Sequence, residues 1–192
     1  MKTVYIVKDM KVAKILVDPM RRAILDLLRQ KPMTQAGLAN ELGLTGASLN
    51  HHMKILRSNR LVTIYKREIE RHRIMQIFLS SVAYLFIYDL DALPKNIARY
   101  FYPVSLERAR AVVSLLLIYS NELSSAYEIE HTTDVINMIS QKLSRHLITA
   151  AKSYENRTIN HGDERHVYEI YGMAIMNLLK EDKKQGCIRL QK

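Results

Sequence analysis

Apolar residues recur at helical spacing through most of the chain. Steps of three and four residues between apolar positions predict helices over residues 9–17 and 18–30, and two more that start at Thr34 and Thr45. Each of the four begins at an aspartate or a threonine, whose side chain can accept hydrogen bonds from the unpaired N–H groups of a first helical turn. The pattern therefore predicts four successive helices in the first third of the chain.

The two helices that begin at threonine share a second feature that favours helix initiation. Met33 is placed to touch Leu38, and Leu44 is placed to touch Leu49, which is the arrangement of a hydrophobic staple. Gly43 lies between the two helices and suits the left-handed conformation at a helix end. Because both staples fix the angle at which the chain enters a helix, this segment predicts a rigid helix-turn-helix.

Strand-forming residues follow the second of these helices. Residues 61–65 and 74–79 are rich in β-branched and aromatic side chains, and a charged segment at residues 68–72 separates them. They predict a hairpin with a longer loop at its tip, and hence a winged helix-turn-helix. Residues 1–8 are expected to form a strand or an extended arm, and residues 82–93 a short helix or a strand-to-helix transition.

The second half of the chain returns to helical spacing. Ser105 is expected to cap a strongly apolar helix, Thr132 or Thr133 to open a second one, and Asp163 to cap a third. No internal repeat is evident. The apolar stripes of these helices are broader than a linker requires.

The expected division of the chain lies at a connector bracketed by Pro94 and Pro103. We expect a winged helix-turn-helix domain over residues 1–93 and an α-helical dimerisation domain over residues 94–192. The predicted fold class is mainly α with a small β-hairpin.

Composition narrows the class of protein. The 192 residues are 48% hydrophobic and 25% charged, which is ordinary for a globular protein. The longest apolar runs are too short to span a bilayer, and the start of the chain lacks a secretory pattern, so we expect a cytoplasmic protein with no membrane contact. The single cysteine, Cys187, excludes an internal disulfide and a cysteine-based zinc site.

Basic residues concentrate in and after the second helix of the predicted turn. The formal net charge is +10, and residues 45–73 contain seven lysines and arginines against two acidic residues. A cluster of this density attracts a polyanion. A solvated surface that happens to be basic is the plainer explanation, and the helix-turn-helix pattern argues against it.

The second helix of the turn offers polar side chains of the kind that read DNA. If Leu49, Met53 and Leu56 face the core, then Ala47, Asn50, His51, Lys54 and Ser58 lie on the opposite side. Asn50 can donate to and accept from a base edge, His51 can contact a guanine or a phosphate, and Lys54 can reach guanine acceptors. The small residues near the helix start allow its N–H groups to approach a phosphate.

The hairpin supplies further cations, which we expect to contact phosphates or enter the minor groove. The predicted DNA-binding residues are Thr45, Ala47, Ser48, Asn50, His51, Lys54, Arg57, Lys66, Arg67, Arg71 and Arg73. Arg57 and Arg60 fit an ordinary surface as well as phosphate contact. For His52 we favour packing or a backbone hydrogen bond, and for Tyr65 packing in the hairpin.

Several segments together carry a family resemblance. Residues 16–25, 38–45 and 48–56, which read LVDPMRRAIL, LANELGLT and SLNHHMKIL, resemble ArsR-type winged-helix transcriptional regulators, in particular archaeal members with an unrelated C-terminal extension. The resemblance covers residues 9–80 and implies a homodimeric repressor released from a near-palindromic operator by a signal. The cysteine pairs of metal-sensing members are missing, and Arg60 stands where the family often has glycine. DNA binding therefore transfers to this chain, and metal sensing does not.

The C-terminal helices either form their own bundle or pair with the same helices of a second chain. We favour the homodimer, because two recognition helices about one DNA turn apart give a small protein useful specificity. Such helices could also enclose a pocket for a small-molecule effector, although an ordinary dimer core is the simpler expectation.

The predicted function is a sequence-specific, dimeric transcriptional regulator bound to double-stranded DNA. A protein that coats DNA without sequence preference and a partner-binding adaptor are the alternatives. Neither a nucleophile elbow, a phosphate loop nor a carboxylate pair is present, so we expect no enzyme and no cofactor. The spacing of His161, Asp163 and His166 does not fit a metal site, so no metal is expected.

Overall fold

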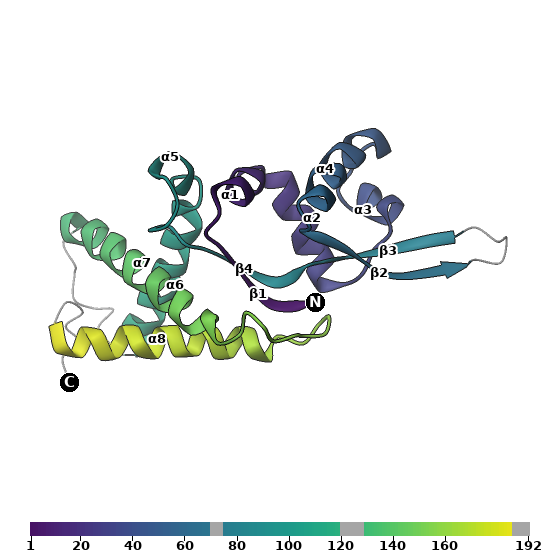
Figure 1. The fold of residues 1–192 in the computed structure, drawn as a ribbon. Helices are drawn as coiled ribbons and strands as arrows, with labels where there is room; N and C mark the ends of the chain where they lie inside the picture. The colour runs from purple at the N-terminus through teal and green to yellow at the C-terminus, as the bar shows by residue number, and fades with distance from the viewer. Residues whose placement is uncertain (70–74, 120–128, 186–192) are drawn as a thin grey trace.

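The structure is mainly helical, with two short sheets. The computed structural model describes residues 1–69, 75–119 and 129–185 (Figure 1). In chain order the elements are β1 (Lys2–Val7), α1 (Met10–Leu16), α2 (Pro19–Gln30), α3 (Gln35–Glu41), α4 (Gly46–Ser58), β2 (Val62–Ile69), β3 (Met75–Ser81), β4 (Ala83–Tyr88), α5 (Lys95–Ala98), α6 (Tyr102–Tyr119), α7 (Ile129–Lys152) and α8 (Arg165–Gln185). A helix-turn-helix, a small antiparallel hairpin and further C-terminal helices confirm the predicted fold class.

The first four helices begin at the residues that the sequence predicts. The carboxylates of Asp9 and Asp18 accept from N–H groups at the starts of α1 and α2. The hydroxyls of Thr34 and Thr45 accept from the third N–H of α3 and α4. Gly43 has a φ of +62°, so the turn between α3 and α4 uses the left-handed conformation expected of it.

The corner between α1 and α2 is fixed by two arginines. Arg22 donates through one terminal nitrogen to the carbonyls of Leu16 and Val17, at 2.7 and 2.8 Å. Arg21 donates to the carbonyl of Ile15 at 3.0 Å. These bonds satisfy carbonyls that a helix end leaves unpaired. The Arg-Arg pair after Asp18-Pro19 is thus a structural device of the helical core.

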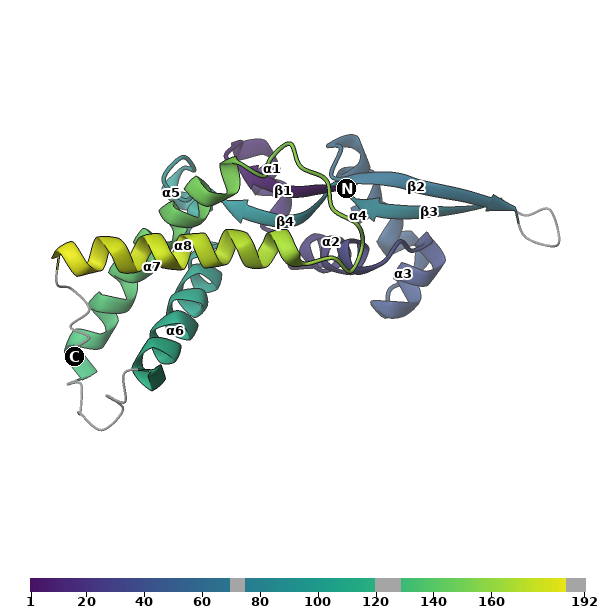
Figure 2. The same ribbon diagram turned by 90° about the horizontal axis from the view of Figure 1, so that it is seen from below.

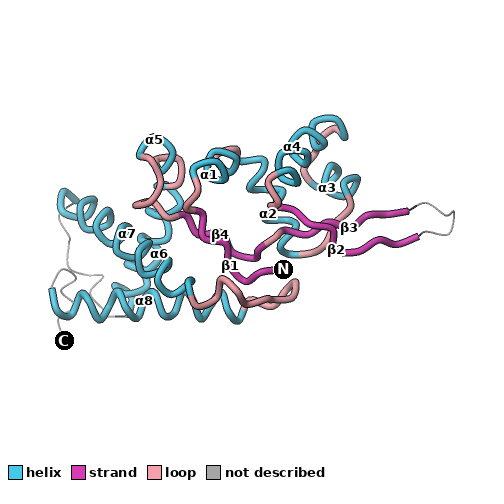
Figure 3. The backbone as a smooth tube through the Cα atoms, viewed as in Figure 1, coloured by secondary structure: helices cyan, strands magenta, loops and turns pink. Residues whose placement is uncertain are grey.

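β2 and β3 form the predicted antiparallel hairpin, which projects from the body of the molecule (Figures 1 and 3). Its register shifts between Ile64 and Lys66, so Tyr65 is an extra residue in β2. Met33 exchanges two backbone hydrogen bonds with Leu79, at 3.1 and 2.8 Å, and ties the base of the hairpin to the start of α3.

The segment predicted as a short helix or strand-to-helix transition over residues 82–93 is instead the strand β4, followed by a turn. β4 pairs in parallel with β1, so that Val4 lies opposite Leu85 and Ile6 opposite Ile87. Both strands carry apolar residues on both faces, which is typical of a covered parallel pair and hides the alternation that marks an exposed strand. The short helix was therefore the wrong alternative, whereas the strand of a strand-to-helix transition is present and α5 begins only at Lys95.

The C-terminal helices differ from the prediction mainly in where they begin. α6 starts at Tyr102, so Ser105 lies inside the helix, where it is buried and does not cap it. α7 starts at Ile129, ahead of the predicted threonines. Asp163 accepts from the N–H of Arg165 at the start of α8, as expected. Figure 2 shows these three helices on one side of the β1–β4 sheet and the hairpin on the other.

The β1–β4 sheet separates two hydrophobic clusters. Val7, with Phe86 and Tyr88 packed nearby, belongs to the cluster around α1 to α4. Val4 and Ile6 belong to the cluster formed with α6, α7 and α8. Residues of the α5 region, such as Phe101, pack with the first cluster although they follow Pro94. The division at residues 93 and 94 stays a prediction.

The chain turns from α4 into β2 through a left-handed residue. Arg60 has a φ of +57°, and its N–H donates to the carbonyl of Arg57 at 3.0 Å. A residue with a Cβ atom adopts this conformation at a disadvantage of roughly 1–2 kcal/mol. Glycine, which the ArsR-type pattern often has here, would adopt it without that strain. Arg60 in place of glycine therefore strains the backbone locally, but the chain still makes the left-handed turn.

Replacing Ile6 by alanine is expected to lower the free energy of unfolding by about 2–5 kcal/mol, because it opens a cavity between β1 and the C-terminal helices. Urea unfolding followed by circular dichroism measures the change. Met10→Ala is the matched control, since this apolar side chain is exposed at the start of α1. Equal destabilisation by both variants would show that β1 is not part of a shared core.

Replacing Arg60 by glycine is expected to raise the free energy of unfolding by about 1 kcal/mol, because it removes the strain of the left-handed conformation. Arg60→Ala removes the same side chain but keeps the strain, so its stability should stay close to that of the natural protein. Thermal and urea unfolding of the three proteins decide the matter. A gain shared by the alanine variant would trace the effect to the lost charge.

Candidate nucleic-acid interface

α4 has one buried face and one exposed face, as the sequence predicts. Leu49, Met53 and Leu56 are buried in the cluster around the helix-turn-helix. The residues predicted to face outward are all exposed: Ala47, Asn50, His51, Lys54 and Ser58. A helix with a free polar face is the element that fits the major groove of DNA.

The N-terminal end of α4 is also open to solvent. Thr45, Gly46 and Ala47 are exposed, and Ser48 is half-buried. The Thr45 hydroxyl accepts from the N–H of Ser48 at 3.2 Å. Because one cap occupies only one of the unpaired N–H groups, the others of the first turn can meet an anion. The structure therefore brings the predicted residues Thr45, Ala47 and Ser48 together at a site that suits a phosphate.

Gln35, at the start of α3, belongs to the same surface and was not predicted. Its amide nitrogen donates to Oδ1 of Asn50 at 2.9 Å. Together with Met53, Lys54 and Arg57 they line a shallow hollow of about 290 Å³. Gln35 follows the capping residue of the preceding helix, and no local pattern in the sequence brings it near Asn50. The contact orients the Asn50 side chain and leaves its amide nitrogen to donate outward.

The two neighbouring histidines have different surroundings. His51 is exposed on the outer face of α4, whereas His52 is half-buried. Nδ1 of His52 lies 3.5 Å from a carboxylate oxygen of Asp18, the residue that caps α2. His52 therefore packs at the edge of the core, as favoured from the sequence, and the exposed ring of His51 is the one that faces outward.

The cations of β2 are exposed, but they differ in their partners. Lys66 pairs with Glu68 and lies 4.7 Å from the centre of the Phe78 ring, so its charge is partly engaged within the hairpin. Arg67 is exposed two residues after the bulge. Arg71 and Arg73, the other two predicted wing residues, lie outside the described residues. Arg67 is thus the described wing cation best placed to meet a phosphate.

The base of the hairpin is held by the loop between α7 and α8. His161 meets the ring of Tyr65 edge-on, with ring centres 5.1 Å apart, and its Nε2 lies 3.0 Å from the Ser80 hydroxyl. Burial, followed by the charge of the N-terminal ammonium group, lowers the pKa of His161 below its ordinary value. A neutral imidazole suits such a ring contact. Tyr65 therefore packs against the α7–α8 loop and not within the hairpin as expected, and its side chain stays 56% exposed.

A second contact anchors the same loop to β4. The hydroxyl of Tyr84 donates to the carboxylate of Glu164. Burial and then this hydrogen bond raise the pKa of Tyr84 to about 12, so the phenol stays protonated at any physiological pH. The α7–α8 loop therefore contacts the wing through His161 and β4 through the hydrogen bond from Tyr84 to Glu164.

The described residues offer neither a metal site nor a membrane-spanning helix. Among residues 1–69, 75–119 and 129–185, no three His, Cys, Asp or Glu side chains are grouped to hold a metal ion. His161 instead contacts Ser80, and His166 contacts the Thr3 hydroxyl at 3.2 Å. None of the helices in these ranges is long and apolar enough to cross a bilayer.

Comparison with known proteins agrees with the helix-turn-helix geometry. Residues 16–65, from the last residue of α1 to the bulge in β2, match the family described as Helix-turn-helix domain. Over 56 residues the chain is 34% identical to the transcriptional repressor SdpR of Bacillus subtilis (strain 168). The match covers 29% of this chain and 62% of that protein's length. The similarity is thus confined to the helix-turn-helix segment, and the chain spans less than two thirds of the length of that repressor.

Proposed function

We propose that this protein is a DNA-binding transcriptional regulator, and that as a homodimer it recognises a specific sequence and represses transcription. The observation that carries the proposal is the exposed polar face of α4, which lies beside the exposed basic strand β2. Both α3 and α4 begin at a capping threonine, which fixes the turn between them. The similarity to a transcriptional repressor supports the same role. A cytoplasmic location is part of the proposal.

In this proposal α4 lies in the major groove and its outer side chains read base edges. Since Oδ1 of Asn50 accepts from Gln35, the Asn50 amide nitrogen is the group that donates. It would favour a base that presents an acceptor, such as guanine N7 or O6 or thymine O4. Lys54, one helical turn further along, would donate to a neighbouring guanine or phosphate.

The remaining predicted residues would contact the DNA backbone. Thr45, Ala47 and Ser48 would bring the start of α4 to a phosphate, and His51 and Arg57 would extend the contact along the helix. Lys66, Arg67, Arg71 and Arg73 would carry the wing along the backbone or into the minor groove. The exposed basic strand β2 supports this part of the proposal.

Homodimerisation is proposed to occur through residues 94–192. Apolar side chains stay exposed on two of the C-terminal helices: Leu115 of α6 is 66% exposed and Met176 of α8 is 54% exposed. Val104 and Met173 add to the exposed apolar area of the same helices. A second copy of the chain would bury such side chains and would place two α4 helices on one DNA duplex.

Selection from random DNA duplexes at physiological salt is the direct test. A regulator of the proposed kind should return two half-sites about one helical turn apart. Equal recovery of all sequences would replace the proposal by the alternative in which the protein coats DNA without sequence preference.

Asn50→Ala and Lys54→Ala are expected to weaken binding to the selected site by about 5- to 150-fold each, which corresponds to roughly 1–3 kcal/mol for a lost base contact. Binding to an unrelated duplex should change much less, because Asn50 carries no charge and Lys54 only one. Fluorescence anisotropy on both duplexes gives the two affinities. An equal loss of affinity for the two duplexes would show that α4 does not read bases.

Arg67→Ala is expected to weaken binding to every duplex and to lower the slope of log affinity against log salt by about 1, because one phosphate contact is lost. Arg110→Ala is the matched control: it removes the same charge from an exposed arginine on α6, where it pairs with Glu107. A slope that falls equally in the control would mean that total charge matters and the position of Arg67 does not.

A further inference from the structure

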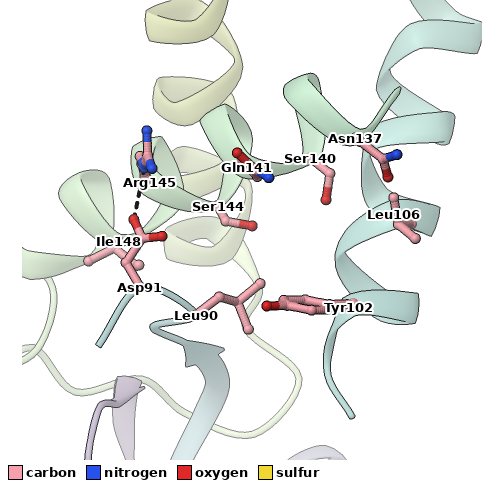
Figure 4. A pocket seen from close by; sticks show the side chains of 10 residues that line it. All are labelled: Leu90, Asp91, Tyr102, Leu106, Asn137, Ser140, Gln141, Ser144, Arg145 and Ile148. Carbon is pink, nitrogen blue, oxygen red and sulfur yellow. Dashed lines mark hydrogen bonds and ion pairs between the residues drawn. The ribbon is translucent and has the colours of Figure 1, made fainter. Parts of the chain in front are cut away.

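A pocket of about 410 Å³ opens between α6, α7 and the segment that follows β4 (Figure 4). Its size lies within the range of about 300–1,000 Å³ that is usual for small-molecule sites. Leu90, Leu106 and Ile148 give it an apolar lining, and polar groups of α7 line the rest. It lies on the C-terminal half of the molecule, away from the exposed face of α4.

The polar lining comes from one stripe of α7. Ile139, Leu143 and Leu147 form the buried apolar stripe of this helix. A second stripe at helical spacing turns toward the pocket and is polar: Asn137, Ser140, Gln141, Ser144 and Arg145. Five polar residues turned toward a neighbouring helix add little to packing. A binding site explains them better.

The pocket is lined by the hydroxyl-bearing side chains of Tyr102, Ser140 and Ser144, two of which contact a serine outside the lining. The buried Ser105 hydroxyl of α6 lies 2.8 Å from the hydroxyl of Ser140 and 2.7 Å from that of Ser144. Figure 4 shows the side chains of Ser140 and Ser144 and the hydroxyl of Tyr102 directed into the pocket. Within the described ranges, the Tyr102 hydroxyl has no hydrogen-bond partner. A ligand with hydroxyl or carbonyl groups can therefore meet several donors and acceptors there.

Arg145 places a guanidinium group at the rim of the pocket. Its Nε lies 2.8 Å from a carboxylate oxygen of Asp91, in the segment after β4, and both side chains are 61% exposed. An exposed pair of this kind contributes little to stability. The carboxylate of a ligand can take the place of Asp91, since guanidinium binds carboxylates through two parallel hydrogen bonds.

We propose that this pocket binds a small hydroxylated carboxylic acid. Its carboxylate pairs with Arg145, its hydroxyl bonds to Ser140, Ser144 or Tyr102, and its carbon chain lies against Leu106 and Ile148.

Binding at Arg145 would act on the segment between β4 and α6. Asp91 lies in that segment, and Leu93 and Phe101 on either side of α5 are buried with the helix-turn-helix. Separating Asp91 from Arg145 therefore removes a link between α7 and a segment anchored in the DNA-binding half. The regulatory meaning of this step rests on the proposed function, whereas the binding site does not.

Calorimetric titration of the full-length protein without DNA tests the site. The probes are 6-hydroxyhexanoate and 4-hydroxybenzoate, two acids of different shape, each compared with its neutral amide. At least one acid should bind at millimolar concentration or below and bind about ten- to a hundredfold more tightly than its amide, because the amide cannot form the charged pair. Failure of both acids to bind, or equal binding of acid and amide, overturns the proposal.

Arg145→Gln should weaken binding of the acid by the same factor and leave the amide unaffected. Arg165→Gln is the matched control, because Arg165 is also an exposed arginine paired with an aspartate, Asp163, outside the pocket. Ser144→Ala is a second variant, expected to weaken binding of 6-hydroxyhexanoate more than that of hexanoate, which lacks the hydroxyl. Circular dichroism verifies that each variant is folded. Unchanged binding by Arg145→Gln overturns the assignment.

The same titration repeated with DNA separates this site from the proposed function. An acid that binds the protein but leaves DNA affinity unchanged keeps the site and removes its regulatory role. A protein that binds the acid and no DNA at all would contradict the proposed function alone.

Discussion

The parallel pairing of β1 with β4 is the constraint on which the arrangement of the molecule depends. Strand β1 contributes Val7 to the cluster around the helix-turn-helix, and Val4 and Ile6 to the cluster of the C-terminal helices. Parallel strands require a long crossover connection, and here that connection is the entire helix-turn-helix with its hairpin. The Ile159 N–H donates to the carbonyl of Met1 at 3.0 Å, so the first residue is held by the α7–α8 loop as well. Losing this pairing would therefore expose apolar surface on both clusters at once.

The same pairing sets the direction of the wing. β4 follows β3 with only Val82 between them, and the Val82 N–H donates to the carbonyl of Leu61 just before β2. The hairpin is thus continuous with a strand that the C-terminal helices cover. Contacts of the α7–α8 loop, through His161 with the base of the wing and through Glu164 with β4, strengthen this connection. A movement of the C-terminal helices would be passed to β4, on which α7 packs, and from β4 along the chain to the wing. It would reach α4 only through side chains packed in the first hydrophobic cluster.

Features set by local chemistry could be predicted from the sequence, and features set by distant partners could not. Caps such as Asp18 and Thr45 are readable because each depends on N–H groups two or three residues away. Ser105 was misread as a cap because its hydroxyl meets Ser140 and Ser144, 35 and 39 residues further along the chain. β4 was predicted only as one of two alternatives, because its partner strand lies about 80 residues earlier and covered strands lack alternation. Gln35 was missed for a similar reason, since only the fold brings it to Asn50.

The parallel arrangement also explains why a pocket near Asp91 is well placed to influence the proposed DNA binding. In a parallel pair the carboxyl ends of both strands lie at the same edge. β4 ends at Tyr88 and continues to Asp91, while β1 ends at Val7 and continues into α1, and the Asp89 N–H donates to the Val7 carbonyl at 3.0 Å. The segment that carries Asp91 therefore lies beside the entry to α1, whose end is bound by the arginines of α2. One backbone hydrogen bond thus joins the Asp91 segment to the end of β1, which leads into α1 and the helical core that supports α4.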